Sequence, residues 1–172
     1  ALKADLAADP GLSERAEFMC RLLREAIAQT RFLARGLVPL GREPDSLQIG
    51  LAELVQRTRA LGRMECEFEC PAPVAVSDFH VAGHLYRIAQ EAVQNAVQHG
   101  RPRRVVIRLS GPEGLECLQV LDDGVGFLPH AHHAGLGLAN MQERAKAIGG
   151  RLQIQSNRGV GTAIACFWQE SR

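Results

Sequence analysis

The sequence has almost no net charge and no long apolar run. Its 172 residues carry 20 lysines and arginines against 19 aspartates and glutamates, a formal charge of +1, which gives no general reason to expect binding to nucleic acid or to an anionic membrane. No apolar run approaches the roughly 18 to 20 residues of a membrane span, and no basic segment followed by an apolar one opens the chain. We therefore expect a soluble, cytoplasmic chain without membrane contact of its own, while membrane attachment of a longer protein stays open.

Paired cysteine motifs, internal repeats and low-complexity tracts are also missing. The five cysteines are scattered through apolar patterns without Cys-x-x-Cys spacing, which suits buried thiols in a reducing cytoplasm better than a disulfide framework. Apolar residues make up 46% and charged residues 23%. These proportions are typical of a globular enzyme or binding module and argue against disorder.

The first part of the chain predicts a helix over residues 13–37, because apolar residues recur there at steps of four and three between charged ones. A narrow apolar seam needs a partner helix, so we expect homodimerisation through a coiled coil or four-helix bundle. Residues 1–9 resemble the end of a preceding helix. The helical pattern breaks at residues 40–46, and we therefore expect a helical domain over 1–40 and a second domain over 41–172.

The second domain alternates between helical and strand patterns. Apolar periodicity predicts helices over residues 47–61, from Ser77 or Asp78 to about His99, and around 138–148, and strands over 64–70, 104–110, 115–121, 151–156 and 162–168. Helices combined with antiparallel pairs of strands indicate an α+β sandwich, in which helices cover one face of a single mixed sheet.

Three polar residues of the long helix, Glu91, Asn95 and His99, are spaced by four and therefore share one face. A carboxylate and a carboxamide together can hold a hydrated magnesium ion and orient or deprotonate a nucleophile. The alternative is a solvated polar face without a ligand.

Asp122, Gly124 and Gly126 follow an apolar strand pattern. A carboxylate at a strand end can accept a hydrogen bond from an exocyclic amine such as that of adenine, and the glycines let the backbone approach a ligand. A plain turn or a weak calcium-like acidic loop would show the same residues.

Gly135, Gly137 and Leu138 open the next helix. Free amide groups at a helix N-terminus bind phosphate, and glycines allow a loop to close over it. A lone Gly-x-Gly is weak evidence, but here it follows the helix face and the acidic loop, and a Gly161-Thr162 pair opens the last strand.

Four motifs in this order resemble the GHKL superfamily of ATPases and kinases: Glu91-x-x-x-Asn95 looks like the N box, Asp122 to Gly126 the G1 box, Gly135 to Leu138 the G2 box, and Gly161-Thr162 the final element. Residues 91–99 (EAVQNAVQH) and 135–144 (GLGLANMQER) resemble sensor histidine kinases of the nitrate-sensor-like subfamily. Residues 29–45 are similar to the second helix of that subfamily's dimerisation domain and to the link that follows it.

This resemblance implies a GHKL-type sandwich preceded by a helical dimerisation segment, with ATP and Mg²⁺ as cofactors. The ATP-binding residues it implies are Asn95, His99, Asp122, Gly124, Gly126, Gly135, Gly137, Leu138 and Thr162.

The roles follow from the same resemblance. Asp122 binds the adenine amine, with Thr162 supporting it through water, and Asn95 coordinates the magnesium ion. Glu91 is the catalytic residue, acting as base or positioning group at the γ-phosphate. Phosphoryl transfer needs mainly such positioning and neutralisation of charge.

The sequence departs from the family in three places. Nothing before Ser13 resembles the motif of the acceptor histidine, so we expect the histidine that is phosphorylated to lie upstream of this chain. Gln98 stands where the family often has lysine, which implies a weaker phosphate or lid contact. His130, His132 and His133 lie in the expected lid, where solvated side chains are a better interpretation than a metal site.

The leading hypothesis is therefore the catalytic region of a two-component histidine kinase that serves a response regulator. Two alternatives remain: a GHKL ATPase that hydrolyses ATP with water, and a nucleotide-sensing dimerisation module without kinase activity.

Overall fold

The computed structural model describes residues 19, 40–41, 43–60, 64–111, 116–127 and 136–169. The chain divides into two units, Ala1–Val38 and Pro39–Arg172, and every element below belongs to the second unit. Apart from the exposed Met19, the helix expected over residues 13–37 lies outside the described residues. The dimerisation seam and the domain boundary therefore stay predictions.

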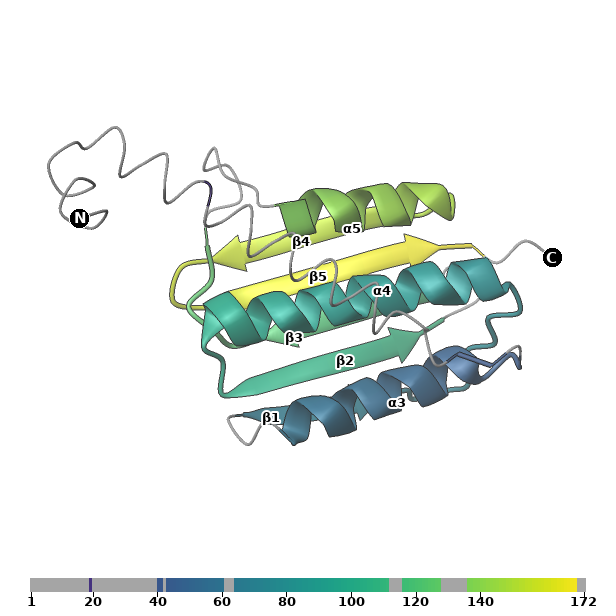
Figure 1. The fold of residues 1–172 in the computed structure, drawn as a ribbon, viewed down its shortest axis with the longest axis horizontal. Coiled ribbons are helices and arrows are strands. Elements are labelled where there is room, and N and C mark those ends of the chain that lie inside the picture. The colour runs from purple at the N-terminus through teal and green to yellow at the C-terminus, as the bar shows by residue number, and fades with distance from the viewer. Residues whose placement is uncertain are drawn as a thin grey trace, which may run out of the picture. The chain divides into compact units, whose positions relative to one another are not determined.

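The second unit is a layer of helices on a mixed β-sheet. Its elements are α3 (Ser46–Arg59), β1 (Glu65–Glu69), α4 (Phe79–Asn95), η1 (Ala96–Gly100), β2 (Arg104–Ser110), β3 (Glu116–Asp122), α5 (Leu136–Ala147), β4 (Arg151–Asn157) and β5 (Gly161–Trp168). The sheet order is β1-β2-β3-β5-β4; β1 and β2 pair in parallel and the other neighbours pair antiparallel. Figure 1 shows α3, α4 and α5 side by side on one face of the sheet, which confirms the predicted fold class.

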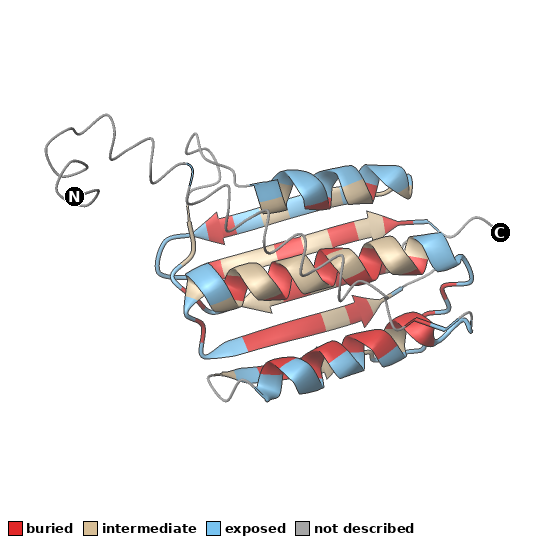
Figure 2. Ribbon diagram, viewed as in Figure 1, coloured by how far each residue is buried: buried red, intermediate tan, exposed pale blue. Residues whose placement is uncertain are grey.

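Helix α4 lies over the centre of the sheet and buries the face that its apolar spacing predicted. The predicted residues Leu85, Ile88, Ala89, Ala92 and Val93, together with Ala96 at the start of η1, are all buried, and so are Ala82 and Tyr86 of α4. Figure 2 shows buried residues recurring along α3 and α4 and filling most of β2, whereas α5 is largely exposed. Among the described residues, no helix combines the length and the apolar character that crossing a bilayer requires.

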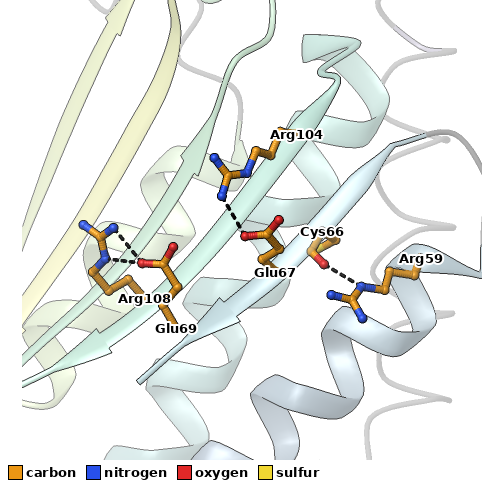
Figure 3. A network of polar contacts seen from close by, with 6 residues as sticks. All are labelled: Arg59, Cys66, Glu67, Glu69, Arg104 and Arg108. Atoms are coloured by element: carbon orange, nitrogen blue, oxygen red, sulfur yellow. Dashed lines mark hydrogen bonds and ion pairs between the residues drawn. The ribbon is translucent and has the colours of Figure 1, made fainter. Parts of the chain in front are cut away.

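The edge of the sheet formed by β1 and β2 carries polar contacts (Figure 3). Ion pairs join Glu67 to Arg104 at 2.7 Å and Glu69 to Arg108 at 2.6 Å, with all four side chains at least one-third exposed. Exposed pairs of this kind contribute little to stability. Arg59 instead donates from Nε to the carbonyl oxygen of Cys66 and joins α3 to β1.

The long helix does not end as an α-helix. It is α-helical to Asn95 and continues as a π-helix over Ala96–Gly100, and Arg101 then takes a left-handed conformation with φ of 48°. Short π segments in α-helices occur frequently at functional sites. A π turn holds slightly more than four residues, so the four-residue step from Asn95 to His99 still returns to about the same side of the helix, although His99 is exposed.

Of the two predicted starts, Ser77 and Asp78, it is Asp78 that caps α4, by accepting hydrogen bonds from the amides of His80 at 2.7 Å and Val81 at 3.4 Å. Replacing such a cap by alanine costs about 1 kcal/mol, so Asp78→Ala should lower the free energy of unfolding by about that amount. Asp45 is the matched control, because it precedes α3 without a side-chain cap bond. Urea denaturation of both variants measures the difference, and equal losses would contradict the capping role.

Candidate functional site

Two polar side chains of α4 lie against the first turn of α5. Glu91 and Asn95 are both half-buried. A Cβ atom on Gly137 would collide with the Glu91 carboxylate and would lie 3.3 Å from Nδ2 of Asn95. Glycine therefore lets α5 approach these side chains closely, and the half-buried Leu138 follows in the same turn. Gly135 lies outside the described residues.

This first group, Glu91, Asn95 and Gly137, joins a carboxylate and a carboxamide to the N-terminal end of a helix. Free amides and the helix dipole favour phosphate at such an end. Magnesium takes one or two protein oxygen ligands, keeps several waters and binds phosphate oxygens as well. The side chains present therefore fit a magnesium-bound phosphate chain, with Asn95 as the protein ligand.

A second group forms around Asp122, the last residue of β3. Asp122 pairs in register with Thr162 at the start of β5, and its carboxylate accepts a hydrogen bond of 2.8 Å from the amide of Gly124. Burial raises the pKa of the Asp122 carboxyl, and hydrogen bonds from the amides of Gly124 and Thr162 and from the Thr162 hydroxyl partly offset this rise. A half-buried carboxylate of this kind can accept a hydrogen bond from a ligand amine.

The loop after β3 is fastened to the end of the central helix. The amide of Val125 donates to the carbonyl of Gly100 at 2.8 Å, and the amide of Gly159 donates to the carbonyl of Val125 at the same distance. A Cβ atom on Gly124 would collide with the Gly100 carbonyl oxygen, and Gly126 has a positive φ of 60°. The sequence suggested that these two glycines admit a ligand, whereas here they admit neighbouring protein backbone.

The two groups lie along one helix. Gly100 lies beside Asp122, since a Cβ on Gly100 would be 3.4 Å from its Oδ1, and the rise of a helix places Glu91 roughly 13 Å away along the axis. An extended nucleoside triphosphate has a comparable length. His99 is exposed and, among the described residues, forms no hydrogen bond with either group.

Sequence reasoning missed two residues here, Gly100 and Ser156. Ser156 is buried and contacts both Phe127 and Thr162. One signal was available: Leu152, Ile154 and Ser156 alternate along a strand, so the serine occupies a position that faces the core. For Gly100 the only hint was its place after the polar helix.

A separate shallow depression lies between α4 and α5. It is lined by His84, Asn140, Glu143 and Arg144, and none of the predicted site residues belongs to it. Burial, together with the nearby charge of Arg144, lowers the pKa of His84. The described residues contain no cluster of three or more histidine, cysteine, aspartate or glutamate side chains that could hold a metal ion; the three lid histidines lie outside them.

Residues 80–172, more than half of the chain, match the family model described as histidine kinase-, DNA gyrase B-, and HSP90-like ATPase. Sensor protein VraS of Staphylococcus epidermidis is 29% identical over 163 residues, covering 91% of this chain and 44% of the relative. Sensor histidine kinase LiaS of Bacillus subtilis is 32% identical over 158 residues, covering 91% and 43%. The chain thus spans less than half the length of these relatives.

Solved structures share the fold. The histidine kinase domain of a blue-light activated histidine kinase from Erythrobacter litoralis superimposes with a TM-score of 0.62 at 19% identity, covering 76% of this chain and 64% of that one. The histidine kinase AdeS from Acinetobacter baumannii gives a TM-score of 0.62 at 13% identity, covering 95% and 84%.

Replacing the neighbouring residues Asp122 and Asp123 by asparagine should change the free energy of unfolding in opposite directions. The pKa of Asp122 is raised by burial, so the folded state resists its ionisation, and this cost appears as pH rises above the unfolded value of about 3.9. Asp122→Asn should therefore stabilise the protein relative to wild type at pH 7, and the gain should shrink as pH falls toward 4. Urea unfolding at several pH values measures it.

Asp123→Asn is the matched control. Hydrogen bonds of 2.8 Å from the amides of Arg104 and Arg103 lower the pKa of Asp123. Ionised Asp123 therefore adds stability that is present above the unfolded pKa and is lost as pH falls through the lowered one. This variant should be less stable than wild type at pH 7, and the same sign for both variants would refute the assignment.

Proposed function

Because the chain belongs to the family of histidine kinase-, DNA gyrase B- and HSP90-like ATPases, we propose that it is the catalytic region of a two-component sensor histidine kinase. It binds ATP with Mg²⁺ and donates the γ-phosphoryl group to a histidine of the full-length protein, for relay to a response-regulator aspartate. The observation that carries this proposal is the contact of Gly137 with Glu91 and Asn95 at one end of a helix whose other end adjoins Asp122.

The base of the nucleotide binds at Asp122. Its carboxylate accepts a hydrogen bond from the exocyclic amine of adenine, and partial burial strengthens that bond because competing water is reduced. Thr162 and the amide of Gly124 hold the carboxylate from the protein side. Discrimination for adenine follows, since a base without the amine leaves this carboxylate unpaired.

The phosphates bind at the first turn of α5, where Gly137 leaves room close to Glu91 and Asn95. Asn95 would hold the magnesium ion, which supplies neutralisation of phosphate charge when bound. Glu91 orients the acceptor imidazole at the γ-phosphate and takes up its proton. This arrangement fits a reaction in which positioning provides most of the rate.

Transfer to histidine, rather than to water, is supported by the relatives, which are named as sensor proteins and sensor histidine kinases. By the same reasoning the partners are a response regulator and a second copy of the chain, paired through the helix over residues 13–37. Residues 91–99 and 135–144 support placement in the nitrate-sensor-like subfamily. Hydrolysis to water and nucleotide sensing are the alternatives that the experiments below separate.

Nucleotide binding is tested by titrating ADP into wild type and into Asp122→Asn by calorimetry. Wild type should bind, and the variant should bind at least tenfold more weakly, because one charge-assisted hydrogen bond is worth about 1.5–3 kcal/mol. Asp123→Asn should retain affinity, since Asp123 accepts from the amides of Arg103 and Arg104 instead. Absence of binding by wild type, or equal affinity of all three proteins, would refute the site.

Phosphoryl transfer is tested with Glu91→Gln in the full-length protein. Loss of a positioned base should slow formation of phosphohistidine by about 10²–10⁴-fold while ADP affinity stays near that of wild type. Glu143→Gln is the control, because Glu143 is exposed on α5 and pairs with Lys146. If wild type instead releases phosphate over many turnovers without forming phosphohistidine, hydrolysis is the function.

A further inference from the structure

Ser156, near the end of β4, is buried and joins three parts of the site. Its hydroxyl oxygen accepts a hydrogen bond of 2.8 Å from the amide of Phe127 in the loop after β3. It also lies 3.0 Å from the hydroxyl of Thr162 and 3.2 Å from the carbonyl oxygen of Gly161, both at the start of β5. One small side chain thus connects the loop after Asp122 with the strand that pairs with Asp122.

The number of protons decides the direction of these bonds. An ionised carboxylate can only accept, and the hydroxyl of Thr162 has a single proton to give. Asp122 and Thr162 lie opposite each other on β3 and β5, and the Thr162 hydroxyl helps to lower the pKa of the Asp122 carboxyl, so its proton points to Asp122 whenever Asp122 is ionised. The Ser156 proton then points to the Thr162 oxygen. The result is a chain of donors that runs in one direction, from Phe127 through Ser156 and Thr162 to Asp122.

The hydrogen bonds among Asp122, Thr162 and Ser156 can also run in the opposite direction. A protonated Asp122 would donate to Thr162, Thr162 would donate to Ser156, and Ser156 would donate to the carbonyl of Gly161 at 3.2 Å. Every donor of the chain has an acceptor in both arrangements. An incoming amine needs an acceptor, and it therefore selects the first arrangement.

We propose that Ser156 is a positioning residue for the nucleotide base, which acts through the Thr162 hydroxyl to hold Asp122 as a hydrogen-bond acceptor for a purine 6-amino group. This inference rests on the proposed nucleotide binding. Hydrogen bonds in a directed chain strengthen one another in a partly buried site. Ser156 therefore contributes to the choice of a 6-amino over a 6-oxo purine without touching the base.

The test compares ADP with inosine diphosphate, which carries a 6-oxo group, by competition binding to Ser156→Ala, Thr162→Val and the double variant. Ser156→Ala should lower ADP affinity about tenfold, the effect of about one hydrogen bond, with a smaller loss for inosine diphosphate. In the Thr162→Val background the same change should cost less than about twofold, because the group through which it acts is already gone. Equal losses for both nucleotides, or equal costs in both backgrounds, would overturn the proposal.

Ser46→Ala is the matched control, since Ser46 is a buried serine at the start of α3. It should leave the preference for ADP unchanged, and a comparable loss there would mean a general structural effect. The same four-protein cycle measured by urea unfolding without nucleotide separates the two proposals. If wild type fails to bind ADP, the proposed function is wrong. The hydrogen-bond chain is then judged by unfolding alone: additive effects of Ser156→Ala and Thr162→Val would overturn it, and non-additive effects would support it.

Discussion

The hydrogen bond from the amide of Val125 to the carbonyl of Gly100 joins the end of the central helix to the loop that leaves the central strand. The relation between the two groups of the candidate site depends on this joint, because it sets Asp122 beside the end of the helix that carries Glu91 and Asn95. Gly124 is required here, since a Cβ atom would collide with the carbonyl of Gly100. The glycine motif after Asp122, which in the sequence suggested a ligand-binding loop, therefore forms in the structure a close backbone contact between this loop and the end of the central helix.

Much of the fold could be predicted because its elements have strong local signals. The apolar spacing along α4 predicted its buried face, and the pair Ser77 and Asp78 predicted its start. Alternating apolar and polar residues predicted strands β4 and β5. The π turn over Ala96–Gly100 could not be foreseen, since its residues carry no pattern that distinguishes it from the α-helix before it. His99 is exposed at this turn, and its contact with ATP stays a prediction.

The site was predictable by its residues but not by its contacts. Asp122, Thr162 and Gly137 could be named from motif order, whereas the approach of Gly137 to Glu91 depends on how α5 packs on α4. Ser156 was missed because hydrogen bonds between β4, β5 and the loop after β3 are long-range in sequence. The adjacent Asp122 and Asp123 make the same point, since burial raises one pKa and amide hydrogen bonds lower the other.

The central claim is that a single nucleotide lies along α4, with its base at Asp122 and its phosphates at Gly137. Nuclear magnetic resonance with a non-hydrolysable ATP analogue and Mn²⁺ in place of Mg²⁺ tests it most directly, because the paramagnetic ion broadens only nearby signals. The account predicts strong broadening of the Asn95 and Gly137 amides, with shifts but weaker broadening at Gly124 and Thr162. Broadening centred on Gly124, or on neither group, would contradict it.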